Sequence, residues 1–268
     1  MKSLIQRVLG RWANRTALPA LKNASSLTAL VDASGLSSPD TLVRMGTQYG
    51  GWIIPFNHAL TEDSVCYLAG AGEDISFDCE LATRFRCKVR ILDPTPRAVE
   101  HFDGLRRAVS EGRRFPVNNS ETEFYEIAAS DLARITFLPV GLAGQDATLK
   151  FFLPRNPAHV SCSTVNLQNT TDYFTAQCFR LSTLMAQQHD ARVALLKIDI
   201  EGAEYSVISD IVRVGLLPPL LLVEFDETHS PRDDEAPRRI REHVELLIAA
   251  GMTCVAVEGS NMTFQRTA

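Results

Sequence analysis

Residues 193–204 read Val-Ala-Leu-Leu-Lys-Ile-Asp-Ile-Glu-Gly-Ala-Glu, and this stretch decides the fold. Five of its first six residues are apolar, a pattern that predicts a strand buried on both faces of a parallel sheet. Two carboxylates, Asp199 and Glu201, follow directly, and then Gly202 and the apolar periodicity of a helix. Because ligands of open α/β sheets bind at the carboxyl ends of the strands, we expect both acids to be site residues. The alternative is that they only cap the following helix, whose N-terminus favours acidic residues.

Length and composition place the chain among ordinary globular proteins. It has 268 residues, of which 45% are apolar and 22% charged, with a net charge of −5. Residues 1–31 carry five basic residues and no acidic one, so the remaining chain is strongly acidic, which argues against a nucleic-acid partner. No run approaches the roughly 20 apolar residues of a transmembrane segment. The six cysteines lack the spacing of a metal site, and we expect a cytoplasmic protein in a reducing compartment.

Residues 1–60 are expected to form a helical N-terminal extension to a Rossmann-like domain spanning residues 61–268. Residues 4–12 place apolar side chains on one helical face with basic residues around it, and a second helix is predicted around residues 39–46. The first helix is expected to dock on its own domain or on a second subunit of a homo-oligomer, and weak contact with an anionic membrane surface is the alternative. Tyr49-Gly50-Gly51-Trp52 marks a backbone bend beside an aromatic side chain that would cover a pocket.

A nucleotide-binding unit is predicted in the first half of the chain. Its order is strand, glycine loop, helix, strand and helix, at residues 64–69, 70–74, 75–86, 89–92 and 95–109. In such units the glycines let the backbone approach the ligand, and the acid after the second strand, here Asp93, accepts hydrogen bonds from ribose hydroxyls. Dinucleotide binders carry a third glycine where this chain has Ile75. That difference favours a ligand with adenosine and no phosphate, such as S-adenosylmethionine.

The second half of the chain continues the alternation of strands and helices. A strand at 135–140 leads into a loop expected to pass under an adenine ring, and residues 154–180 are expected to be an irregular lid. The other predicted elements are strands at 147–153 and 220–223, helices at 181–188, 203–212 and 237–250, and a terminal hairpin at 252–257 and 262–266. This pattern predicts a mostly parallel seven-stranded sheet with a C-terminal antiparallel hairpin. It fits a class I methyltransferase better than a dehydrogenase.

Three motifs carry a family resemblance. They are Gly-Ala-Gly-Glu-Asp-Ile-Ser-Phe at 70–77, Asp-Pro-Thr-Pro at 93–96 and, most specifically, Leu-Lys-Ile-Asp-Ile-Glu-Gly-Ala-Glu at 196–204. With Tyr49–Trp52 they make roughly residues 47–227 resemble the FkbM-type S-adenosylmethionine-dependent methyltransferases. The resemblance implies a Rossmann-like class I fold and O-methylation of a hydroxyl group on a sugar, a glycan or a secondary-metabolite acceptor.

The resemblance also implies roles for single residues. The expected cofactor-binding set is Gly70, Gly72, Glu73, Asp74, Ser76, Asp93, Pro94, Gly141, Leu142 and Asp199. Within it, the two loop glycines would border the methionine part of the cofactor, Asp93 the ribose, and residues 141–142 the adenine. The general base is left open between Glu201, Asp226 and His229. A histidine is expected soon after the strand that ends at Glu224, and this chain has Asp226 there instead.

Three further hypotheses stay open on the sequence alone. A Mg²⁺ ion held by Asp199, Glu224 and Asp226 is one, because oxygen-rich acidic sites suit magnesium. A nicotinamide-dependent oxidoreductase is another, although Ile75 and the lack of a Tyr-x-x-x-Lys pair disfavour it. The last is a non-catalytic module that binds an adenosine ligand, which would not consume the cofactor.

Overall fold

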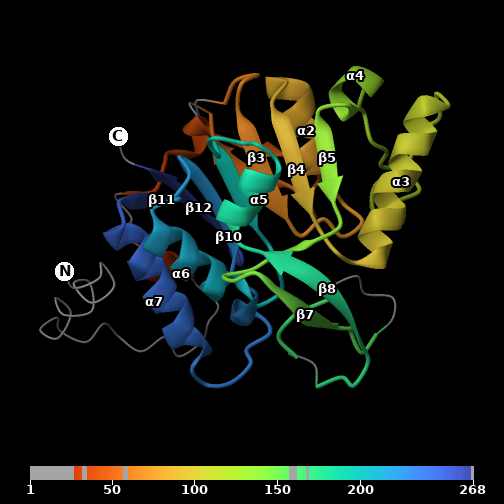
Figure 1. Ribbon diagram of the computed structural model, residues 1–268. Coiled ribbons are helices and arrows are strands. Elements are labelled where there is room, and N and C mark those ends of the chain that lie inside the picture. Colours follow the sequence, from red (N-terminus) through yellow and green to blue (C-terminus); the bar gives the residue numbers. More distant parts are fainter. Residues whose placement is uncertain (1–26, 32–34, 57–59, 157–161, 167–168, 267–268) are drawn as a thin grey trace, which may run out of the picture.

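The computed structural model describes residues 27–31, 35–56, 60–156, 162–166 and 169–266 (Figure 1). The helix predicted at residues 4–12 lies outside these ranges. A seven-stranded sheet forms the centre of the protein, in the order β11 (Met252–Glu258), β12 (Asn261–Arg266), β10 (Leu220–Glu224), β9 (Leu195–Ile198), β3 (Val65–Ala69), β4 (Lys88–Leu92) and β5 (Ile135–Leu138). Strand β12 runs antiparallel to both of its neighbours, and the pairs from β10 to β5 are parallel. The predicted sheet with its antiparallel C-terminal pair is therefore confirmed.

Helices cover both faces of this sheet, because its central strands are apolar on both sides. In β9, Leu196 and Ile198 belong to the hydrophobic core on one face, and Leu195 belongs to the core on the other. The first face carries α5 (Leu181–Gln187), α6 (Glu204–Val214) and α7 (Ala236–Ala249). The second carries α2 (Ser76–Phe85), α3 (Pro96–Ser110) and α4 (Ala129–Leu132). Short 3-10 turns at Leu27–Leu30, Pro39–Thr41, Val117–Asn119 and Asp226–Thr228 complete the helical elements of the described residues.

A second, three-stranded sheet lies near the carboxyl ends of the central strands (Figure 1). It consists of β6 (Gly141–Leu142), β8 (Tyr173–Phe179) and β7 (Ala147–Phe152), with β8 in the middle. The strand predicted at 147–153 is confirmed, but it pairs within this small sheet. The prediction that all of residues 154–180 are irregular is wrong, because residues 173–179 find partner strands on both sides.

The helix predicted around residues 39–46 is also wrong. A 3-10 turn at Pro39–Thr41 is followed by β1 (Leu42–Met45), which pairs antiparallel with β2 (Trp52–Pro55). The hairpin is held by tertiary contacts: Met45, Trp52 and Ile54 are buried in the core beside α2, and the Thr263 hydroxyl donates a 2.6 Å hydrogen bond to the Ile53 carbonyl. Such contacts override local helical propensity. A domain boundary after residue 60 stays a prediction.

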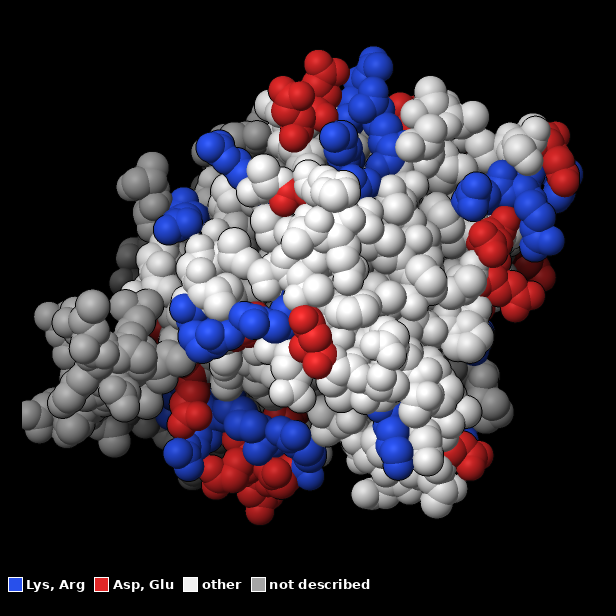
Figure 2. Space-filling view, in the orientation of Figure 1, with Lys and Arg blue, Asp and Glu red and all other residues white. Residues whose placement is uncertain are grey.

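The charge distribution shows no single-sign field on the face drawn in Figure 2. Acidic and basic side chains alternate there in small groups, and the lowest group lies over the segment that follows β10 and the start of α7. In this part of the chain Arg239 pairs with Glu227, and Arg238 pairs with Glu242. None of the helices in the described ranges has the length and apolar character that crossing a membrane requires.

Candidate active site

A cavity of about 520 Å³ lies at the carboxyl ends of β3, β4, β9 and β10. This is where open α/β sheets bind ligands, and the volume is in the range of small-molecule sites. Of the residues predicted from the sequence as site residues, all but Ser76 line it, namely Gly70, Gly72, Glu73, Asp74, Asp93, Pro94, Gly141, Leu142, Asp199, Glu201, Glu224, Asp226 and His229. The fold therefore brings together residues from all three sequence motifs.

Asp93 fixes the shape of the glycine loop. One of its carboxylate oxygens accepts hydrogen bonds from the backbone N–H groups of Ala71 (2.9 Å) and Gly72 (3.1 Å). The other accepts from the backbone N–H (2.8 Å) and the hydroxyl (2.6 Å) of Thr95. These four bonds use about all the lone-pair sites of an ionised carboxylate. Asp93 is thus a structural residue of the loop, and its role in ribose binding stays a prediction.

Gly70 packs the loop directly against the end of β9. Its backbone is in the left-handed region (φ +85°), and a Cβ atom added there would lie 1.8 Å from the carbonyl oxygen of Asp199. No other residue fits without displacing one of the two chain segments.

Lys197 contacts the same two segments, the glycine loop and the end of β9. Its ammonium group donates to the Gly70 carbonyl (2.6 Å) and pairs with the Asp199 carboxylate (2.9 Å), although the residue is only 5% exposed. Burial lowers the pKa of Lys197, but Asp199 and Asp78 raise it by more, so that the net pKa is raised and the lysine stays charged. Lys197 was not among the site residues predicted from the sequence. Its signal was a lysine within a run of buried apolar positions, where an unpaired lysine is almost never found.

Asp74 and Ser76 hold the loop between β1 and β2. The Asp74 carboxylate accepts from the Thr47 hydroxyl (2.5 Å), the Gly50 N–H (3.2 Å) and the Ser76 N–H (3.0 Å). The Ser76 hydroxyl oxygen accepts from the Thr47 N–H (2.9 Å) and faces this loop, so the geometry gives no support to a cofactor contact by Ser76. The loop carries Tyr49 to the cavity wall, as expected for an aromatic that covers a pocket.

Glu73 lines the cavity with its charge already compensated. Its two carboxylate oxygens accept from the Nε (3.1 Å) and an Nη (2.7 Å) of Arg97, a bidentate arrangement, and Asn119 adds a third bond at 3.0 Å. Glu73 therefore contributes shape to the site more than free negative charge.

Two buried carboxyl groups hold the turn after β9. The Gly202 N–H lies 2.9 Å from a Glu204 oxygen and 3.1 Å from an Asp226 oxygen, and Glu204 and Asp226 are both almost fully buried. Glu201 has a left-handed backbone (φ +57°), an unusual conformation for a residue with a side chain, and its carbonyl accepts from the Ser163 hydroxyl. The strained turn is thus held by Glu204, Asp226 and Ser163, and Glu201 in this turn lines the cavity.

The carboxyl groups of this region hold protons more tightly than usual. Burial and the nearby Asp199 raise the pKa of Glu224 to about 8, and burial raises the pKa of Glu204 to about 7. Burial and the Glu204 charge raise the pKa of Asp226 well above its ordinary range. Perturbed carboxyl groups in a cleft are typical of functional sites.

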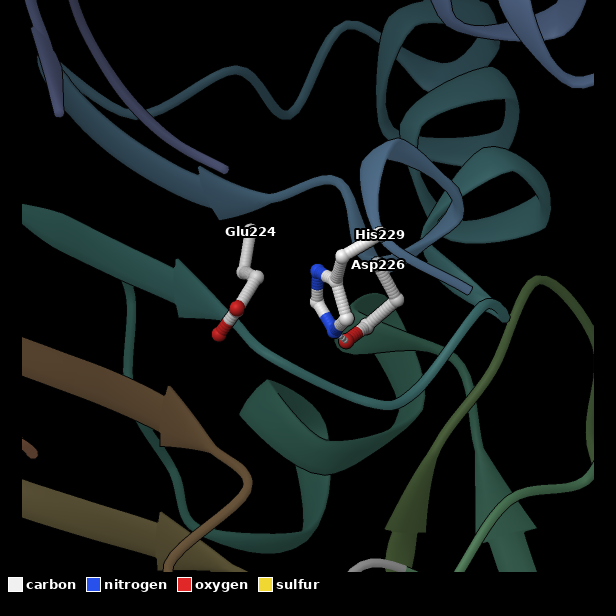
Figure 3. Close-up of side chains that lie close together, drawn as sticks. All are labelled: Glu224, Asp226 and His229. Carbon is white, nitrogen blue, oxygen red and sulfur yellow. Dashed lines mark ion pairs between the residues drawn. The ribbon is translucent and has the colours of Figure 1, made fainter. Parts of the chain in front are cut away.

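Glu224, Asp226 and His229 form a compact group, with one potential ligand atom of each within 4.8 Å of the others. Figure 3 shows the His229 imidazole beside the Asp226 carboxyl group, with an Nε2–Oδ1 distance of 3.7 Å, and the Glu224 carboxyl group across from them. Two of the three predicted Mg²⁺ ligands recur in this group, with His229 in place of Asp199. A bound Mg²⁺ stays a prediction.

The turn between β11 and β12 was recognised from the sequence as a turn but not as part of the site. Glu258, Gly259, Ser260 and Asn261 line the cavity, and the Ser260 hydroxyl donates to Glu224 (2.7 Å). Strand β11 points the same way as β10, because both are antiparallel to β12. Its C-terminal turn therefore falls at the ligand-binding edge of the sheet. Cys162 and Thr164, in the segment predicted to be a lid, were likewise missed as lining residues.

The fold and the site define a methyltransferase of the Rossmann-like class I type. A family model described as the methyltransferase FkbM domain matches residues 69–248, more than half of the chain, and the chain belongs to this family. Membership implies S-adenosylmethionine as the methyl donor.

A structural comparison found an O-methyltransferase family protein from Burkholderia thailandensis, with a TM-score of 0.35 and 13% sequence identity. The match covers 76% of this chain and 51% of the other, so the chain spans about half the length of that protein. No curated protein sequence matches this chain.

Proposed function

We propose that this methyltransferase acts on a hydroxyl oxygen of a sugar, a glycan or a secondary-metabolite acceptor. One observation carries the proposal: all three candidate bases, Glu201, Asp226 and His229, line the same cavity as the glycine loop. An alcohol hydroxyl is weakly acidic, so that a base within reach of its proton assists transfer to oxygen.

The residues present fit S-adenosylmethionine. Leu92 and Leu142 offer apolar surface for an adenine ring, and Asp199, paired with Lys197, suits the positive groups of the methionine part. When bound, the cofactor supplies a methyl group on a positively charged sulfur. The glycine loop, fixed by Asp93, would hold the cofactor in place, and positioning of this kind supplies much of the rate in group transfer.

Burial and hydrogen bonding favour two of the three candidate bases. Asp226 is only 2% exposed and its carboxyl group accepts from the Gly202 N–H, so it is poorly accessible to an acceptor's proton. Glu201 on the strained turn and His229, with its side chain 56% exposed, remain in position to take the acceptor's proton. We therefore propose Glu201 or His229 as the base, with Asp226 orienting the imidazole.

Calorimetric titration of the full chain with S-adenosylmethionine, S-adenosylhomocysteine and NAD tests the cofactor assignment. We expect micromolar binding of the first two, no binding of NAD, and loss of binding in Asp93→Ala. Binding of NAD alone would overturn the assignment of S-adenosylmethionine as the cofactor. If S-adenosylmethionine binds but is not converted to S-adenosylhomocysteine with any of a panel of acceptors, a non-catalytic module that binds an adenosine ligand would be favoured instead.

The base is tested with His229→Asn and Glu201→Gln. For the true base we expect kcat to fall about 10²–10⁴-fold with unchanged cofactor affinity. His189→Asn is the matched control, because His189 is exposed and does not line the cavity, and asparagine tolerates its left-handed backbone (φ +56°).

A further inference from the structure

Tyr49 is a large aromatic side chain on a fixed loop, yet 72% of its surface is exposed. The loop is anchored by backbone donors: the N–H of Gly46 to Glu80 (2.7 Å), of Thr47 to Ser76 (2.9 Å), and of Gly50 to Asp74 (3.2 Å). Gly50 also has no room for a side chain, since a Cβ atom would lie 2.5 Å from the Asp74 carboxyl carbon. A rigid backbone that presents an aromatic ring to a cavity offers a ready surface for a ligand.

The cavity wall near this ring is strongly acidic. Glu201, Glu224, Asp226 and Glu258 line it, and among the described lining residues the lysines and arginines are Arg44 and Lys197. Both cations already have carboxylate partners, since Arg44 pairs with Glu258 and Lys197 with Asp199. An acceptor that carries a carboxylate or phosphate would therefore find no lysine or arginine in that wall left to offset its charge.

The cofactor is expected to contact only part of this carboxyl-rich wall. S-adenosylmethionine has two positive groups and one carboxylate, and it is assigned to the side of the cavity formed by the glycine loop, Asp93 and Leu142. In the order of the strands, β9 separates the glycine loop after β3 from Glu224 and Asp226 after β10 and from the β11–β12 turn, which line the same cavity. These carboxyl oxygens can accept hydrogen bonds from an amino group of the acceptor.

We infer that the acceptor is a ring compound that carries a positively charged amino group, and that Tyr49 binds the charged part of that ring. The inference rests on the proposed function and narrows its acceptor class to amino sugars and similar cationic rings. A cation near the face of a tyrosine ring is attracted by the ring's electron distribution, and neighbouring carboxylates add to the attraction.

Three matched probes test the charge preference: glucosamine, glucose and glucuronic acid. Each is titrated by calorimetry into the full-length protein saturated with S-adenosylhomocysteine, in the presence of EDTA. We expect glucosamine to bind about fivefold or more tightly than glucose, and glucuronic acid to give no binding.

Variants test the role of Tyr49 itself. Tyr49→Leu is expected to weaken glucosamine binding about tenfold and to remove its advantage over glucose, whereas Tyr49→Phe keeps both because the ring face remains. Tyr173→Leu is the matched control. Tyr173 is a 47% exposed tyrosine on β8 that also lies near a cation, Lys150, but does not line the cavity.

The inference is overturned if glucose and glucosamine bind equally, if glucuronic acid binds best, or if none of the three probes binds. It is also overturned if the preference needs added Mg²⁺, which would assign the acidic wall to a metal ion. A wild-type response from Tyr49→Leu would remove Tyr49 from the acceptor site. The titration with S-adenosylhomocysteine distinguishes failure of the proposed function from failure of this inference. If S-adenosylhomocysteine does not bind, the proposed function is overturned. If it binds but glucosamine is not preferred over glucose, only this inference is overturned.

Discussion

At the scale of single residues, Asp78 shows how the site depends on charges buried beneath it. It lies in α2, is 3% exposed, and one of its carboxylate oxygens has no hydrogen-bond partner. Burial raises the pKa of Asp78 to about 7, and the charge of Lys197 opposes part of that rise. The folded protein therefore keeps a proton on Asp78 over a pH range in which the unfolded chain releases it.

This proton makes stability depend on pH. Because the folded pKa lies above the ordinary aspartate value, the stabilising contribution is fully present below about pH 4 and is lost as the pH rises through about 7. We expect Asp78→Asn, which cannot ionise, to lack this loss of stability. At pH 9 the resulting difference in unfolding free energy from the wild type would be on the order of 1–4 kcal/mol, or several degrees in Tm. Thermal unfolding from pH 5 to 9 measures it, with the exposed Asp103→Asn in α3 as control. Parallel profiles for the wild type and Asp78→Asn would contradict the prediction.

Residue-scale reasoning from sequence worked best for polar side chains at strand ends. Asp93, Asp199 and Glu224 were predicted as site residues because carboxylates after apolar strands stand out, and all three line the cavity. Lys197 and Ser260 were not predicted, because their importance depends on what faces them across the fold. The sequence gives their identity, but the Gly70 carbonyl and the Glu224 carboxyl group that they contact come from distant segments.

At the scale of elements, the glycine loop after β3 allows a direct steric test. Gly70 and Gly112 both have left-handed backbones, with φ of +85° and +65°, but no atom lies within 4 Å of a Cβ added at Gly112. We expect Gly112→Ala to cost about 1–2 kcal/mol, from backbone strain alone. Gly70→Ala also meets the Asp199 carbonyl and should lower affinity for S-adenosylhomocysteine more than about tenfold. Calorimetry and thermal unfolding of both variants measure the difference, and equal behaviour of the two would refute the close packing of loop and strand.

The elements that were predicted correctly are those whose sequence pattern is complete within one segment. Strands β3, β9 and β10 are apolar on both faces, so burial can be inferred without knowing their neighbours. Strands β1 and β8 were missed because each is only partly buried and depends on pairing with another segment, β2 in one case and β6 and β7 in the other. Local pattern does not contain that information.

At the scale of the whole molecule, strand β12 connects regions that are far apart in the sequence. It inserts between β10 and β11, and its Asn261 lies opposite Glu224 in the register. The same strand reaches the N-terminal hairpin through the Thr263–Ile53 hydrogen bond. The acidic wall and the hairpin that carries the Tyr49 loop are therefore connected by one C-terminal strand.

Phe264 is the residue that tests this connection. It is fully buried in the core beside α6 and α7, so Phe264→Ala is expected to destabilise the protein by about 3–5 kcal/mol through lost burial and a residual cavity. Ile248→Ala in α7 is the control, since Ile248 is 42% exposed and should cost less than about 1 kcal/mol. Urea unfolding at constant pH compares them. Because β12 positions Ser260 and Glu224, we also expect Phe264→Ala to weaken glucosamine binding more than S-adenosylhomocysteine binding, and an equal loss of both would show that β12 stabilises the fold without bracing the acceptor side.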